Sequence, residues 1–148
     1  MRPLLVAALA VLALAAGAYA DGVVVPVTVR PGPLALSPVT ALARGTQISV
    51  TVTDARGQGA GWTLLARLSG PIGRTVVVTG VDTRCGDRST CTVPRTNIRY
   101  PVMLTTLRST PLIDAQRGTG MGKIVLIVRL GSQARLGAAL RFAVRSND

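Results

Sequence analysis

The chain has 148 residues, a formal net charge of +11, two Cys, one Trp and no His. Its six acidic residues are all Asp, and all but one of its seventeen basic residues are Arg. Without His or Glu the chain cannot form a Ser-His-Asp or Cys-His triad, a Glu-x-x-His metal site or a Glu acid/base pair, and two Cys cannot form a four-thiolate zinc site. We therefore expect no catalytic, cofactor-binding or metal-ligating residues.

The first twenty residues have the three-part layout of a secretory signal peptide. A positive start, Met1–Pro3, precedes the apolar run Leu4–Ala16, and Ala18-Tyr19-Ala20 forms an A-x-A cleavage site before Asp21. The alternative is an uncleaved membrane anchor, but a spanning helix needs roughly 20 apolar residues, more than this run supplies. We expect cleavage between Ala20 and Asp21. The mature chain, 21–148, would then be an exported single domain with a net charge of +10, because the removed segment carries one Arg.

Alternation with a period of two dominates the mature chain, and helical periodicity is scarce. About seven short strands, separated by Gly, Pro and Asp turns, predict an all-β domain, an antiparallel β-sandwich. Pro26 lies within the first of these strands, which suggests that it is an edge strand. The Pro-rich stretch Pro31–Pro38 is predicted to be a loop. In chain order, the expected strands are Val23–Arg30, Gln47–Asp54, Trp62–Leu68, Thr75–Val81, Tyr100–Leu107, Lys123–Leu130 and Leu140–Arg145.

Two glycine-rich stretches, Gly57–Gly61 and Gly118–Lys123, could be taken for phosphate-binding loops. Such a loop needs a helix directly after it, so that the helix N-terminus aims its N–H groups at the anion. Strand patterns follow both stretches instead, and Ile124 stands where a Ser or Thr would hold magnesium. We predict that both are hairpin loops.

Cys85 and Cys91 are close in sequence within a chain expected to be exported. Nearby Cys in exported proteins most often form a disulfide. The alternative is a redox pair, but the five residues between the two Cys differ from the C-x-x-C spacing of oxidoreductases. We predict a disulfide that closes a loop.

The excess of Arg has two interpretations. It could reflect only a coding bias and a solvated sheet face, but a charge of +10 on a small domain also attracts polyanions over a long range. Aromatic residues make up 3% of the chain, too few for the stacking surface of a single-strand nucleic-acid binder. Because the protein is expected to be exported, we expect its binding partners to be anionic wall polymers or phospholipid surfaces rather than nucleic acid.

The segment Val50–Leu64 contains the pattern T-D-x-R-G-x-G-x-G-W-x-L and includes the only Trp. It resembles the first signature of the WxL-domain family, in which Trp62-Thr63-Leu64 would be the W-x-L itself. Upstream, Val27–Val29 and Gly32–Ser37 are similar to the family's opening strand and G-x-L turn. The second W-x-L of the family is replaced by Phe142-Ala143-Val144, which keeps an aromatic and an aliphatic residue on one strand face.

The resemblance implies an exported surface protein of Gram-positive bacteria whose β-rich module attaches non-covalently to the cell wall, usually through peptidoglycan. It makes Asp54, Arg56, Trp62 and Leu64 candidate wall-binding residues. For Trp62 two roles remain open at this point: a core aromatic, or a partly exposed ring that stacks on a ligand.

Three functions follow from these observations. We expect a non-enzymatic cell-surface protein that binds peptidoglycan or anionic wall polymers. The alternative is a structural subunit of a coat or fibre, self-associating by edge-strand addition with Val23-Val24-Val25 as a donated strand. A third possibility, a secreted enzyme, requires two Asp to meet in one pocket.

Overall fold

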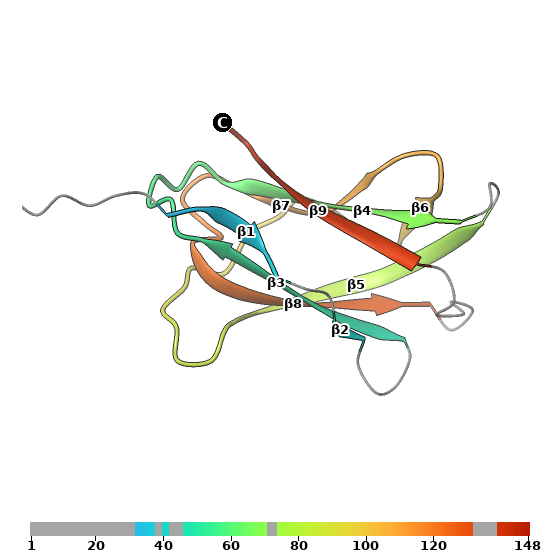
Figure 1. Ribbon diagram of the computed structural model, residues 1–148, viewed down its shortest axis with the longest axis horizontal. Helices are drawn as coiled ribbons and strands as arrows, with labels where there is room; N and C mark the ends of the chain where they lie inside the picture. The colour runs from blue at the N-terminus through green and yellow to red at the C-terminus, as the bar shows by residue number, and fades with distance from the viewer. Residues whose placement is uncertain (1–31, 38–39, 42–45, 71–73, 132–138) are drawn as a thin grey trace, which may run out of the picture.

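Two antiparallel sheets lie face to face in the computed structural model (Figure 1). The structure describes residues 32–37, 40–41, 46–70, 74–131 and 139–148. The expected signal peptide, its cleavage site and the expected strand Val23–Arg30 lie outside these ranges. Within them all regular structure is β-strand, and no helix is long and apolar enough to cross a membrane.

The larger sheet has the strand order β1-β3-β8-β5-β6, and β2 also pairs with β3. The smaller sheet has the order β7-β4-β9. In the larger sheet the strands are β1 (Leu34–Leu36), β2 (Thr40–Ala41), β3 (Gln47–Asp54), β5 (Thr75–Cys85), β6 (Val102–Thr105) and β8 (Gly122–Leu130). In the smaller sheet they are β4 (Trp62–Ser69), β7 (Thr110–Ala115) and β9 (Ala139–Ser146).

One hydrophobic core fills the space between the sheets, and the alternation in the sequence forms it. Successive side chains of a strand point to opposite faces, so every second residue of β3, β8 and β4 faces the opposite sheet. The inward residues of these three strands are buried: Ile48, Val50, Val52, Trp62, Leu64, Ala66, Leu68, Ile124, Leu126, Val128 and Leu130. The expected all-β sandwich is confirmed, and the described strands share one hydrophobic core.

The structure has nine described strands rather than about seven. The sequence pattern missed β7 because a register shift opposite Leu64 and Leu65 breaks the alternation, so that Leu112 and Ile113 are both buried. It also missed β2, which has only two residues, and β1, which lies within Pro31–Pro38. That stretch was expected to be a loop, but Leu34–Leu36 pairs with the end of β3.

The two glycine-rich stretches are not hairpin loops, so that prediction was wrong. Gly57–Gly61 joins β3 to β4, and Gly118–Met121 leads from β7 into β8, which begins at Gly122, so each stretch carries the chain from one sheet to the other. The two crossovers are neighbours, because the N–H of Gly118 donates a hydrogen bond to the carbonyl of Gly59 at 2.7 Å. We call this end of the sandwich, with both crossovers and the last residues of β9, the crossover end.

Candidate functional site

A buried ion pair between Asp54 and Arg56 organises the crossover end. Arg56 Nε lies 3.0 Å from Asp54 Oδ1, Arg56 Nη2 lies 3.0 Å from Oδ2, and the backbone N–H of Arg56 also donates to Oδ1 at 3.1 Å. The Asp54 side chain is 1% exposed and that of Arg56 is 12% exposed. Burial by itself raises the pKa of Asp54, but the hydrogen bonds and charge of Arg56 outweigh it, so the pKa lies below its usual 3.8.

The same guanidinium reaches two other parts of the chain. Arg56 Nη2 donates to the carbonyl of Gly61 at 2.9 Å, and Nη1 donates to Ser146 Oγ and lies 3.4 Å from the Asp148 carboxylate. A guanidinium has five N–H donors, and each one has an acceptor here. Arg56 therefore connects β3, the first crossover and the end of β9, and it has no donor left for a ligand.

Trp62 and Leu64 are core residues. Both side chains are fully buried, and Trp62 Nε1 donates a hydrogen bond to the carbonyl of Gly120 at 2.7 Å. They are buried because β4 is the central strand of the smaller sheet and both residues face the larger one. Neither side chain is accessible to a wall polymer, and for Trp62 the burial favours the core role over a stacking role. Phe142 and Val144 of β9 pack against the same core as partly buried side chains.

Glycine is required where the crossovers pass close to other chain segments. Gly61 has a φ of 85°, and a Cβ there would lie 2.3 Å from the carbonyl oxygen of Ala115. Gly120 has a φ of 74°, and its Cβ would lie 2.8 Å from Trp62 Nε1. Gly61 and Gly120 therefore allow the two crossovers to pack closely against β7 and Trp62, where a larger residue would clash.

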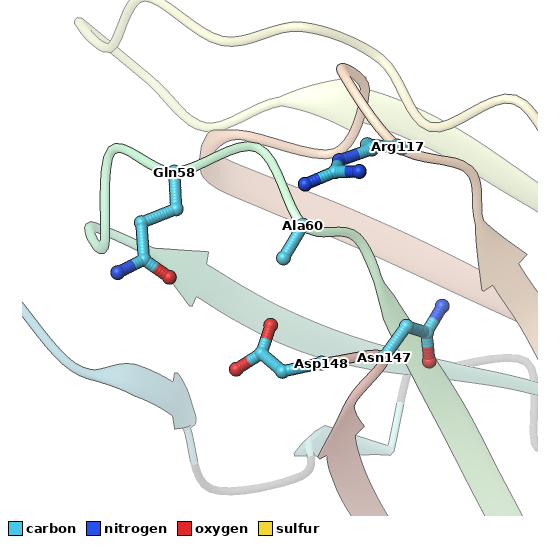
Figure 2. Close-up of a pocket in the computed structure, with 5 residues that line it drawn as sticks. All are labelled: Gln58, Ala60, Arg117, Asn147 and Asp148. Carbon is cyan, nitrogen blue, oxygen red and sulfur yellow. The ribbon is translucent and has the colours of Figure 1, made fainter.

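The crossover end also has an accessible hollow of about 640 Å³ (Figure 2). It is lined by Gln58, Ala60, Arg117, Asn147 and Asp148. A second hollow of about 380 Å³ shares Asn147 and is lined in addition by Thr63, Ile98, Pro111, Asp114 and Arg145. Amide and charged groups line both hollows beside apolar surface, which Ala60 contributes to the first and Ile98 and Pro111 to the second.

The two Asp that Arg56 contacts do not form an acid/base pair. Asp54 is buried and its pKa is lowered, whereas a general acid needs a raised pKa to hold its proton near neutral pH. Asp148 lies on the far side of the same guanidinium. Among the described residues, no group of three or more His, Cys, Asp or Glu is placed to hold a metal ion.

Three exposed arginines on the outer face of the smaller sheet form a second candidate site, which the sequence pattern only half revealed. Arg67 of β4 is the direct cross-strand partner of Arg141 of β9, and Arg145 lies on the same face of β9. We call Arg67, Arg141 and Arg145 the outer arginine face. The alternation of β9 places Arg141 and Arg145 on one face, but only the strand register shows that Arg67 is opposite Arg141.

None of these three arginines forms a salt bridge within the described part of the chain, where only Arg56 and Arg129 do. An acidic group, Asp114, lies close to this face, since it lines the same hollow as Arg145. Like charges directly opposite each other on a sheet destabilise it. An anion seated between Arg67 and Arg141 would relieve this repulsion and accept charge-assisted hydrogen bonds from both.

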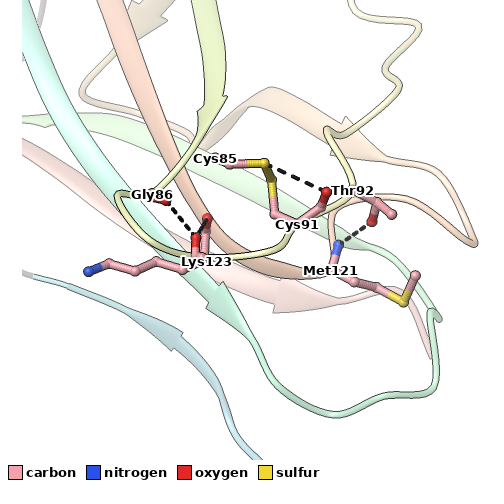
Figure 3. The surroundings of a disulfide bond; sticks show 7 residues. Cys85, Gly86, Cys91, Thr92, Met121 and Lys123 are labelled. Atoms are coloured by element: carbon pink, nitrogen blue, oxygen red, sulfur yellow. Dashed lines mark hydrogen bonds between the residues drawn. A yellow bond between two sulfur atoms is a disulfide. The ribbon is translucent and has the colours of Figure 1, made fainter.

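The predicted disulfide between Cys85 and Cys91 is confirmed (Figure 3). It joins the end of β5 to a residue that forms an isolated bridge with Gly122 at the start of β8. The enclosed loop is held further by the N–H of Gly86, which donates to the carbonyl of Lys123 at 2.8 Å. Directly after the loop, Thr92 and Met121 form a pair of hydrogen bonds. The disulfide therefore anchors the segment that covers the second crossover.

Comparison with protein-family models, curated proteins and solved structures finds no match to this chain.

We predict that replacing both Cys by Ser lowers the free energy of unfolding by about 2 kcal/mol, because the disulfide restricts the unfolded chain over a short loop. Urea denaturation followed by circular dichroism measures this. A reducing agent should lower the stability of the wild type to that of the variant and leave the variant unchanged. Equal stability of the oxidised wild type and the variant would contradict the prediction.

We predict that Asp54→Asn lowers the free energy of unfolding by roughly 3 kcal/mol at pH 7, because it removes the buried counter-charge of a largely buried guanidinium and leaves only the exposed carboxylate of Asp148. The folded pKa of Asp54 is depressed, so its contribution is complete above the unfolded pKa of about 3.9 and is lost as the pH falls through the folded value.

The difference between wild type and Asp54→Asn should therefore shrink in denaturation series carried below pH 4. Asp82→Asn is the matched control, because the Asp82–Arg129 pair is exposed and should contribute less than about 1 kcal/mol. A gap between wild type and Asp54→Asn that stays constant down to acid pH would refute this role of the pair.

We expect Trp62→Ala to cost roughly 3 to 5 kcal/mol, because it opens a cavity in the core. Trp62→Phe should cost less, although it leaves the Gly120 carbonyl without its donor. Circular dichroism is the suitable probe, since both variants remove the only Trp. Leu107→Ala, at an exposed position, is the control and should change stability by less than about 0.5 kcal/mol. A Trp62→Ala chain as stable as the control would show that the ring is not a core residue.

Proposed function

We propose that this chain is an exported, non-enzymatic cell-surface protein that associates non-covalently with the bacterial cell wall through an anionic wall polymer. The observation that carries the proposal is the outer arginine face, where two exposed arginines lie directly opposite each other on one sheet and a third lies on the same face. The signal-peptide pattern supports export, and the resemblance of Val50–Leu64 to the WxL signature supports the cell wall as the location.

Binding would be mainly electrostatic. Every described Arg and Lys other than Arg56 is exposed, so the domain carries a positive field that attracts a polyanion from a distance. Phosphate or carboxylate groups of the polymer would then be held by the guanidinium groups of Arg67 and Arg141, which suit bidentate contacts. Arg145 is four residues from Arg141, about 13 Å along the strand, so it would contact a different group of the same polymer.

The four residues that the resemblance suggests as ligand contacts have another role in this proposal. Asp54, Arg56, Trp62 and Leu64 hold the crossover end together, and this in turn fixes where β4 and β9 lie. The two hollows at that end, with Arg117 and Arg145 in their walls, would supply additional polar contacts to sugar or peptide groups. Peptidoglycan itself would be recognised there rather than by the indole of Trp62.

The alternative function is a structural subunit that self-associates by edge-strand addition. The observation in its favour is β9, an eight-residue strand at the edge of the smaller sheet. Analytical ultracentrifugation of residues 21–148 separates the two proposals, because wall binding does not require self-association.

We predict that purified residues 21–148 sediment with isolated Gram-positive cell walls at low salt and are released as the salt concentration rises, because exposed charges are screened. Neutralising the outer arginine face with three Gln substitutions should weaken binding by about tenfold or more. The matched control removes the same charge elsewhere, with Arg84→Gln, Arg88→Gln and Lys123→Gln, and should retain most of the binding.

Cell walls stripped of phosphate-bearing polymers distinguish the two ligands. Loss of binding to stripped walls identifies the anionic polymer, and unchanged binding identifies peptidoglycan. Arg141→Gln alone should be at least as stable as wild type in urea, because it removes a like-charge contact. Pelleting that does not depend on salt, or equal weakening by the two triple variants, would show that the outer arginine face is not the binding site.

A further inference from the structure

The hollow beside Arg145 lies on the outer face of the smaller sheet and is built around one row of strand partners. Thr63 of β4 pairs with Asp114 of β7 on one side and with Arg145 of β9 on the other. Thr63 points away from the core, because the residues before and after it in β4 are both core residues. The same hollow of about 380 Å³ is also lined by Ile98, Pro111 and Asn147. Arg145 therefore belongs both to this hollow and to the outer arginine face.

A hydrogen-bond network holds one wall of the hollow in place. Thr63 Oγ1 lies 2.9 Å from Asp114 Oδ1 and 2.8 Å from Asn147 Oδ1, and Asn147 Nδ2 donates to Asp114 Oδ1 at 3.1 Å. The backbone of Asp114 is held as well, because its N–H donates to Thr96 Oγ1 at 3.2 Å. A wall that is ordered before binding lowers the entropy cost of holding a ligand.

Two groups of opposite charge remain available to a ligand on the two sides of Thr63. Within the described part of the chain, Asp114 Oδ2 accepts no hydrogen bond, and the Arg145 guanidinium forms neither a hydrogen bond nor a salt bridge. The strand between them separates their backbones by about 10 Å. A ligand lying between these groups must therefore offer a donor to Asp114 and an acceptor to Arg145.

These two charges favour a neutral occupant. Asp114 would repel an anion in the hollow, and Arg145 would repel a cation, which the positive field of the whole domain also disfavours. A hydroxyl is neutral and has one donor and two acceptor positions, so it can bond to either residue. Sugars carry several such hydroxyls on one ring, together with C–H groups that can contact apolar side chains.

We propose that this hollow binds a sugar residue, and that the ligand of the outer arginine face is therefore an anionic polymer that carries sugars. Asp114 would accept a hydrogen bond from one hydroxyl and Arg145 would donate to another, while Ile98 and Pro111 contact the C–H groups of the ring. The volume of the hollow falls within the range of small-ligand sites, about 300 to 1,000 Å³. This inference rests on the proposed function, because it names the class of polymer that the same face binds.

The positions of the arginines determine where the anion and the sugar would lie. Arg145 is four residues from Arg141 on β9, so the hollow begins about 13 Å along the strand from the pair of Arg67 and Arg141. A phosphate at that pair and a sugar in the hollow would belong to the same polymer chain. A polymer without sugars would contact the arginines and gain nothing from Asp114.

The test measures the affinity of residues 21–148 for three immobilised probes. These are poly(glycerol phosphate) without sugars and the same polymer with either glucosyl or N-acetylglucosaminyl groups. Wild type is compared with Asp114→Ala and with Asp82→Ala, a matched control that removes the same charge from an exposed position of the larger sheet. Circular dichroism confirms that each variant is folded. If Asp114→Ala is not folded, Asp114→Asn replaces it, because Asn keeps the oxygen that bonds to Thr63 and turns the free oxygen into a donor.

We expect wild type and Asp82→Ala to bind at least one sugar-bearing probe about tenfold more tightly than the bare polymer, because the sugar adds hydrogen bonds to charged groups. The Asp114 variant should lose this preference and bind the bare polymer no more weakly than wild type does, since it removes a negative charge beside Arg145. Wild-type binding to the bare polymer that is as tight as to both sugar-bearing probes, or a preference unchanged in the Asp114 variant, overturns the sugar site and leaves the arginine face in place. Failure to bind any of the three probes overturns the proposed function and this inference with it.

Discussion

The ion pair of Asp54 and Arg56 is the interaction on which the rest of this fold depends. Its carboxylate lies at the end of β3, and its guanidinium reaches the first crossover and the end of β9. A charge so deeply buried is tolerated only when its hydrogen bonds are satisfied, and all five donors of Arg56 are. The two sheets are therefore held in one relative position at the end where the chain crosses between them.

Trp62 completes this arrangement from inside the core. Its ring fills the space between the sheets directly after the crossover, and its N–H bonds to the second crossover at Gly120. Packing thus explains the residues that resemble the WxL signature. The Arg56 guanidinium donates hydrogen bonds to the Asp54 carboxylate and the Gly61 carbonyl, and the indole N–H donates to the Gly120 carbonyl. A motif with this structural role would be retained whatever the ligand, so ligand contacts are better sought on the exposed faces. The outer arginine face, where the like charges of Arg67 and Arg141 lie directly opposite each other, is the clearest of these faces.

Much of the fold was predictable because one sheet face is buried. Period-two alternation identified β3 with its observed bounds, and it placed β4, β8 and β9 to within one residue of their observed ends. It failed where local geometry departs from regular pairing, as in β7 with its register shift. The disulfide was also predictable, because Cys85 and Cys91 are few residues apart and have no competing partner.

By itself the sequence determined the fold class and the kinds of catalytic and metal site that its composition excludes. The fold class follows from the period-two alternation of apolar residues, and the excluded sites follow from the lack of His and Glu and the presence of only two Cys. Tertiary structure alone decided which residues meet. Gly57–Gly61 and Gly118–Gly122 look like hairpin loops in sequence, but they cross between sheets, because strand pairing is a long-range property that local turn residues do not specify. For the same reason Arg67 meets Arg141 across seventy-four positions only through the register of β4 with β9, and Trp62 is buried because β4 is a central strand.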